Sequence, residues 1–133
     1  MIFVDSSFWI AAANIRDSRH REAEALYATS RDETLVTTNH VRGETWTYLQ
    51  RKAGRARALD FLDDLARSTR VRVHFVTAEQ DDEALRWLRR HDEREYSFVD
   101  AASFAVMRSL KIRQALAFDG DFTAAGFVEL RSS

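Results

Sequence analysis

Ile2-Phe3-Val4-Asp5 is the stretch that decides the fold, because it is a continuous apolar run that ends in a carboxylate. An apolar run without alternation predicts a strand that is buried on both faces, as in a parallel sheet. A similar run, Ala115 to Phe118, ends at Asp119 near the other end of the chain. Parallel strands end at the same edge of a sheet, so we expect both carboxylates in one crevice beyond that edge.

Short β-rich runs alternate with longer helical segments along the rest of the chain. This alternation predicts an α/β fold with a mostly parallel sheet and helices on both faces. Further strands are expected at 35–37, 71–76 and 127–130, the last at an edge of the sheet, and one helix is expected over 40–53 with Asn39 as its N-cap. At roughly 100–200 residues per domain, residues 1–133 are expected to form a single domain.

The composition excludes several classes of protein. The chain has no Cys, which excludes disulfide frameworks, thiolate nucleophiles and zinc–cysteine sites. Its apolar stretches are far shorter than the roughly 18 residues of a membrane span, and the N-terminus lacks a basic signal-peptide region, so we expect a cytoplasmic protein without membrane contact. The net charge is −1, with 20 Lys+Arg against 21 Asp+Glu. Of the basic residues 18 are Arg, which suits phosphate binding but is also typical of a GC-rich genome.

Several acids occupy positions where strands end or helices begin. Asp5 and Asp119 follow strands, and each is also a plausible helix cap or turn residue. Asp100 comes three residues after Ser97 in a capping-box pattern, a role that is compatible with a side chain directed at the crevice. Glu44 is expected near the first turn of the 40–53 helix, where dipole stabilisation is the alternative to a role in a site.

Converging carboxylates point to a divalent cation. Carboxylates in one crevice raise each other's pKa, and such clusters persist when a cation neutralises them. All-oxygen ligands select Mg²⁺ or Mn²⁺ rather than Zn²⁺, and Mg²⁺ is commonly bound by one or two carboxylates together with substrate phosphates. This chemistry indicates phosphodiester hydrolysis by a metal-activated water.

Four short motifs resemble the PIN-domain family, specifically the VapC-type toxin ribonucleases of type II toxin–antitoxin systems. The resemblance covers essentially the whole chain and is carried by Phe3-Val4-Asp5-Ser6-Ser7, Gly43-Glu44-Thr45, Ser97-Phe98-Val99-Asp100-Ala101 and Ala117-Phe118-Asp119-Gly120-Asp121-Phe122. It implies a three-layer α/β/α fold with a five-stranded, mostly parallel sheet.

The resemblance also implies a catalytic quartet around Mg²⁺ or Mn²⁺. Its members are Asp5, Glu44, Asp100 and Asp119. The three aspartates are expected as metal ligands, and Glu44 is expected to bind a second metal or orient the attacking water. Supporting roles fall to Ser6, Ser97 and Asp121.

Partners and substrate follow from the same resemblance. It implies a homodimer held inactive by a VapB-like antitoxin, and an RNA substrate whose cleavage blocks translation. The stretches 39–41, 91–96 and 120–127 are similar to a subgroup that cuts the sarcin–ricin loop of 23S rRNA, while tRNA is the alternative substrate. A non-catalytic RNA- or partner-binding module and a small metal-dependent phosphatase are the alternative functions.

Two further groups of residues have open roles. The aromatic residues Phe8, Trp9, Trp46, Tyr48 and Trp87 belong either to the core or to an apolar groove for the antitoxin or the second subunit. The basic residues belong either to a ring of phosphate contacts around the acids or to solvated helix faces. They form two groups: Arg42, Arg51, Lys52, Arg55 and Arg57, and Arg86, Arg89, Arg90 and Arg94.

Overall fold

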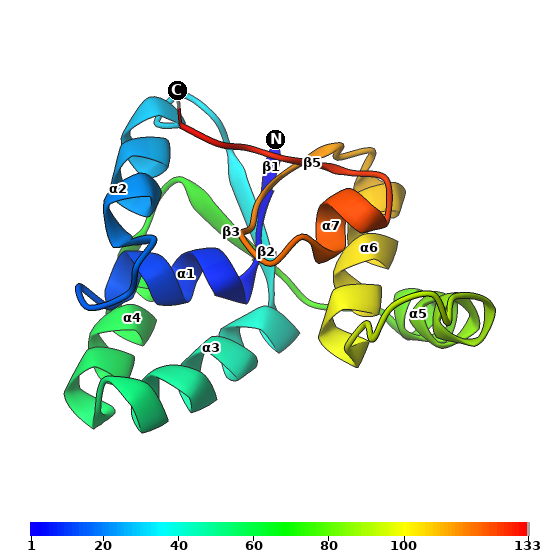
Figure 1. Ribbon diagram of the computed structural model, residues 1–133, viewed down its shortest axis with the longest axis horizontal. Helices are drawn as coiled ribbons and strands as arrows, with labels where there is room; N and C mark the ends of the chain where they lie inside the picture. Colours follow the sequence, from blue (N-terminus) through cyan, green and yellow to red (C-terminus); the bar gives the residue numbers. More distant parts are fainter. Residues whose placement is uncertain (133) are drawn as a thin grey trace.

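A five-stranded sheet organises the computed structural model, which describes residues 1–132 (Figure 1). Its order is β3-β2-β1-β4-β5, and every neighbouring pair is parallel. The strands are β1 (Ile2–Val4), β2 (Leu35–Thr38), β3 (Val71–His74), β4 (Gln114–Leu116) and β5 (Val128–Glu129). The α/β fold with the expected strands is confirmed, and the sheet is wholly rather than mostly parallel.

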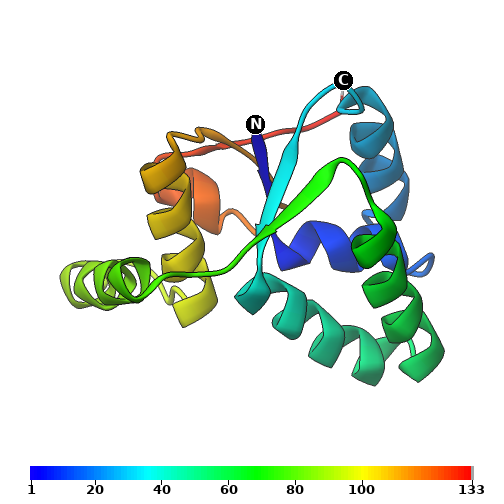
Figure 2. The same cartoon turned by 180° about the vertical axis from the view of Figure 1, so that it is seen from behind.

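Helices cover both faces of the sheet. They are α1 (Ser6–Ala13), α2 (His20–Thr29), α3 (Asn39–Lys52), α4 (Arg55–Arg67), α5 (Ala78–Arg90), α6 (Phe98–Leu110) and α7 (Asp121–Ala124). In Figures 1 and 2, α1 to α4 lie on one side of the sheet and α5 to α7 on the other. This division follows from the chain path, because the strands run outward from β1 through β2 to β3 and then return to β4 and β5 on the far side of β1.

The candidate site lies where the strand order reverses, between the adjacent parallel strands β1 and β4. β1 lies between β2 and β4, with Val4 opposite Leu116 in the register. The backbone N–H of Asp5 donates to the carbonyl of Leu116 at 3.0 Å, so the ends of the two strands are joined where the helices diverge. In open α/β sheets, such a switch point leaves a crevice at the carboxyl ends of the strands.

The core is built from the buried strands, from one face of the other long helices and from the middle of α6, which is buried all round. All three residues of β1 and all four of β2 are buried, as are eight of the thirteen residues of α6. Trp87, Phe104 and Phe122 make edge-to-face contacts along the α6 side, with ring centroids 5.0 Å apart in the pairs Trp87–Phe104 and Phe104–Phe122. No helix within residues 1–132 combines the length and the apolar character needed to cross a membrane.

Two local predictions were wrong. The N-cap of α3 is Thr38, whose hydroxyl accepts from the N–H of Val41 at 3.0 Å, and Asn39 is the first helical residue. The Asn39 side chain instead accepts from the N–H of Val76 at 2.9 Å, which fixes the segment after β3. The strand expected up to Phe118 ends at Leu116, because the chain then bends to begin the turn that carries Asp119.

Candidate metal-dependent active site

Asp5 is almost completely buried at the end of β1, with 1% of its surface exposed. It is the N-cap of α1, and its Oδ2 accepts from the N–H of Ser7 at 3.2 Å and from the Ser7 hydroxyl at 2.7 Å. Its Oδ1 is also buried but has no hydrogen-bond partner among the described residues. An unpartnered buried carboxylate oxygen costs free energy unless a donor or a cation satisfies it.

Ser7 joins the two strand ends and was not predicted as a site residue. Its hydroxyl donates to Asp5 and accepts from the N–H of Phe118 at 3.0 Å, 111 residues further along the chain. The predicted supporting residue Ser6 has a different contact, since its hydroxyl donates to Oε1 of Glu44 at 2.5 Å. The consecutive serines therefore position two different acids.

Asp100 lies in the first turn of α6 and performs both halves of the predicted capping box. The Ser97 hydroxyl accepts from the N–H of Asp100, and Oδ2 of Asp100 accepts from the N–H of Ser97, each at 3.0 Å. Only 7% of Asp100 is exposed. The capping role and the inward placement at the crevice thus hold together.

A tight turn after β4 carries Asp119 and Asp121. Gly120 between them has φ +82°, a left-handed conformation that strains residues with a Cβ. Oδ1 of Asp119 accepts from the N–H of Asp121 at 3.1 Å. Asp100, Asp119 and Asp121 each offer one carboxylate oxygen, and these three atoms all lie within 4.8 Å of one another.

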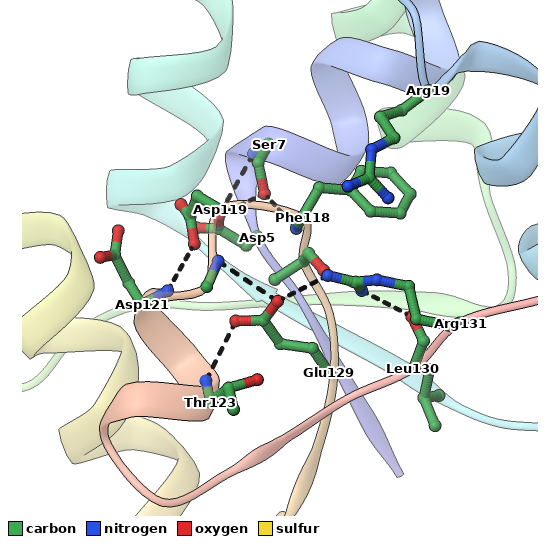
Figure 3. A network of polar contacts seen from close by, with 12 residues as sticks. Asp5, Ser7, Arg19, Phe118, Asp119, Asp121, Thr123, Glu129, Leu130 and Arg131 are labelled. Carbon is green, nitrogen blue, oxygen red and sulfur yellow. Dashed lines mark hydrogen bonds and ion pairs between the residues drawn. The ribbon is translucent and has the colours of Figure 1, made fainter.

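The turn is supported from below by Glu129 of β5, which the sequence reasoning missed (Figure 3). Its carboxylate accepts from the N–H groups of Gly120 at 3.3 Å and Thr123 at 3.0 Å. Arg131 donates to Glu129 at 2.9 Å and to the carbonyl of Ala117 at 2.7 Å. The Glu129 side chain is 2% exposed, so this network fixes the backbone that presents Asp119.

Glu44 lies in the second turn of α3 rather than near the first, because the helix begins at Asn39. Among the described residues it is not part of the group within 4.8 Å, and neither is Asp5. Its hydrogen bond to Ser6 nevertheless fixes Glu44 to the residue that follows Asp5. The structure thus places Asp5 near Asp119 and Asp100, and Glu44 is joined to Ser6, the residue that follows Asp5.

Burial and mutual repulsion raise the pKa values of three carboxyl groups. Burial, followed by the charges of Asp119 and Asp100, raises the pKa of Asp5 well above its ordinary range against the opposing hydrogen bonds from Ser7. Burial is also the main reason that the pKa of Asp100 rises to about 7, with contributions from Asp121 and Asp119. Desolvation, Asp121 and Glu129 raise the pKa of Asp119.

These features fit a divalent cation. The donor set consists of carboxylate oxygens, which suit Mg²⁺ or Mn²⁺. The buried Oδ1 of Asp5 has no hydrogen-bond partner among the described residues, and burial together with the neighbouring acids raises the pKa of Asp5 and Asp100, so a cation would relieve both effects. Asp100, Asp119 and Asp121 are the residues with an oxygen available to one ion, and Asp5 lies close enough to both Asp100 and Asp119 for their charges to raise its pKa.

The basic residues divide according to their contacts. Arg86 and Arg90 form ion pairs with Glu83, while Arg94 reaches the acidic turn and bonds to Asp121 at 2.6 Å. In the other group, Arg42 and Arg55 lie over the rings of Phe75 and Trp46, with centroid distances of 5.3 and 5.7 Å.

The aromatic residues also divide. Phe8, Trp9 and Trp87 are core residues, whereas Trp46 is half-buried and Tyr48 is exposed. Trp9 also borders a cavity of about 780 Å³ between α1, α2 and α4, together with Tyr27 and Phe61.

Comparison with known proteins gives a consistent result along the whole chain. The profile of the PIN domain matches residues 2–128. The 23S rRNA-specific endonuclease VapC20 of two Mycobacterium tuberculosis strains is 57% identical over 131 residues, which is 98% of this chain and 98% of the relative. The crystal structure of M. tuberculosis VapC20, a sarcin–ricin loop cleaving toxin, superposes with a TM-score of 0.94 at 54% identity and covers 99% of this chain and 100% of the other.

Proposed function

Because the chain belongs to the PIN-domain family, we propose that it is an Mg²⁺- or Mn²⁺-dependent endoribonuclease that hydrolyses a phosphodiester in the sarcin–ricin loop of 23S rRNA. The observation that carries the proposal is the 57% identity to VapC20 over 98% of both chains. The expected resemblance to a VapC-type toxin is confirmed by that relative and by the structural match. A cut in this loop would block translation. Cleavage of tRNA is the alternative, and the experiment below distinguishes the two substrates.

The roles of the acids in this proposal follow from their positions. Asp5, Asp100 and Asp119 would hold the ion, and Ser97 and Ser7 orient two of these carboxylates through their hydrogen bonds. Glu44, held by Ser6, would orient the attacking water or hold a second ion. When bound, the ion supplies charge neutralisation and a more acidic water.

The reaction consumes one water. A P–O bond forms to the water oxygen, the P–O bond to the leaving ribose oxygen breaks, and one proton ends on that leaving oxygen while the other is released.

The experiment that tests the proposal maps RNA 5′ ends after the purified protein is incubated with intact ribosomes and total tRNA. We expect one new end in the sarcin–ricin loop with Mg²⁺ or Mn²⁺ and none with EDTA or with the Asp100→Asn variant. Cleavage that persists in EDTA would contradict the metal requirement. Intact RNA under every condition would favour a non-catalytic binding module. New 5′ ends found only in tRNA would show that tRNA, and not the sarcin–ricin loop, is the substrate.

Partners form the second part of the proposal. We infer a cytoplasmic homodimer of one-domain chains, silenced by a VapB-like antitoxin, from the membership of the family. The cavity beside Trp9, Tyr27 and Phe61 offers apolar surface for a partner segment. Light scattering of the purified chain tests the dimer, and co-purification with the product of an adjacent antitoxin gene, together with loss of cleavage, tests the antitoxin.

A further inference from the structure

Arg94 lies in the loop between α5 and α6 and contacts the turn that carries two of the acids. Its Nε donates to Oδ1 of Asp121 at 2.6 Å, and its Nη2 donates to the carbonyl oxygen of Asp119 at 3.0 Å. A Cβ at Gly120 would lie 3.2 Å from Nη2, so the guanidinium rests closely against the backbone of the turn. Within residues 1–132, no other arginine hydrogen bonds to Asp5, Asp100, Asp119 or Asp121.

The guanidinium of Arg94 keeps unused donors on a side chain that is partly exposed. A guanidinium has five N–H groups, and the contacts of Arg94 within the described chain use two of them. Its side chain is 42% exposed, whereas that of Asp121 is 18% exposed. Arg131, by contrast, bonds to Ala117, Leu130 and Glu129, so its donors serve the support of the turn.

The position of Arg94 favours the approach of a negatively charged phosphate. An RNA phosphate is negative and must approach a crevice lined by carboxylates, so a fixed positive group at its rim lowers the cost of that approach. A guanidinium keeps its proton under the conditions in which proteins work, so Arg94 stays charged during turnover. The planar fork of arginine matches two phosphate oxygens at once.

We propose, on the basis of the function proposed above, that Arg94 binds the non-bridging oxygens of the scissile phosphate and that Asp121 is the positioning residue that holds its guanidinium. Asp121 then acts through Arg94 rather than as a necessary metal ligand. The guanidinium keeps its proton throughout and stabilises charge on the phosphoryl oxygens while one P–O bond forms and another breaks.

Single-turnover cleavage of a sarcin–ricin-loop oligonucleotide with Mn²⁺ provides the first test. We expect Arg94→Ala to be about 100-fold slower and Arg94→Lys to recover about tenfold, because lysine keeps the charge without the fork. Asp121→Asn should slow cleavage about tenfold alone but less than about twofold in the Arg94→Ala background. The matched control is Arg67→Ala, which removes an exposed arginine paired to Asp64 at 3.2 Å and should stay within about twofold of the wild type.

Two binding measurements separate this role from a structural one. Calorimetric titration should give Mn²⁺ affinities for Arg94→Ala and Asp121→Asn within about threefold of the wild type, because neither residue is a required ligand in this proposal. In EDTA, the slope of log Kd against log salt for the oligonucleotide should fall by about 0.7 in Arg94→Ala, as for one lost phosphate contact.

The contrary outcomes are distinct. Wild-type cleavage by Arg94→Ala overturns the proposal, and so does tighter Mn²⁺ binding with faster cleavage, which would make the guanidinium a competitor of the metal. Loss of Mn²⁺ affinity in proportion to cleavage would make Arg94 a structural link or Asp121 a ligand. If the wild type cleaves no RNA, the proposed function fails, and an unchanged salt slope in Arg94→Ala then overturns the phosphate contact independently.

Discussion

Asp100→Asn should stabilise the metal-free protein at neutral and alkaline pH while removing its cleavage activity. The wild-type carboxyl is 7% exposed and lies beside other acids, and its pKa rises from 3.8 to about 7 on folding. The capping box survives the substitution, because the asparagine carbonyl can still accept from the N–H of Ser97. The variant therefore removes a buried charge with little loss of structure.

The magnitude follows from the linkage between protonation and folding. The folded state holds the Asp100 proton up to about pH 7, whereas the unfolded state releases it near 3.8. Stability is thus fully present below the lower pKa and falls as the pH rises through the window between the two values. A difference of this size has a ceiling of about 4 kcal/mol, and since the neighbouring acids share the charge we expect about 2 kcal/mol.

Urea denaturation in EDTA at pH 4.5 and pH 8 measures this effect. We expect the variant to exceed the wild type by about 0.5 kcal/mol at pH 4.5, where about a quarter of the effect is already present, and by about 2 kcal/mol at pH 8. Ser97→Ala is the control, because loss of the cap should cost about 1 kcal/mol at both pH values. An equal difference at both pH values, or a variant that is less stable at pH 8, would refute the reasoning.

Three further predictions concern the ion, the turn and the strand ends. The apparent Mn²⁺ affinity should weaken by up to about tenfold per pH unit below pH 7, because the ion must displace the proton of Asp100, and calorimetry that finds no pH dependence would contradict this. Gly120→Ala should lower the free energy of unfolding by about 1–2 kcal/mol, because the residue at this position has a left-handed φ. Gly43→Ala should raise it by up to about 1 kcal/mol, because Gly43 is an exposed helical residue with open space around it. Urea denaturation measures both changes. Ser7→Ala should destabilise the protein by about 1–3 kcal/mol and slow cleavage by at least about tenfold, because both hydrogen bonds of the Ser7 hydroxyl are lost. Thermal unfolding and RNA cleavage measure these effects, and a variant with unchanged stability and unchanged activity would count against the assigned contact.

Much of the fold and the acidic cluster followed from local sequence pattern. The unalternating apolar runs indicated buried parallel strands, and the rule that parallel strands end at one edge brought Asp5 and Asp119 together. Ser97 and Asp100 formed the capping box that their spacing predicted. These predictions held because strand burial and helix capping depend on a few neighbouring residues.

The unpredicted features depend on partners that are distant in the sequence or on competition between neighbours. Ser7 bonds to Phe118 and Arg94 bonds to Asp121, and neither contact has a local signature. Thr38 and Asn39 are both good N-caps, and Thr38 takes this position because the Asn39 side chain is bound to the segment after β3. Glu129 resembles any strand-edge acid in the sequence, and its role appears only when β5 lies beneath the turn.

The pairing of β1 with β4 has a consequence for synthesis of the chain. Val4 pairs with Leu116, so Asp5 and Asp119 come together only after more than 110 intervening residues have been made. Contacts of such sequence separation form late and slowly compared with those of helices and hairpins. A nascent chain cannot assemble the acidic cluster before Asp119 has left the ribosome, so a chain that is still being synthesised up to that point lacks the site.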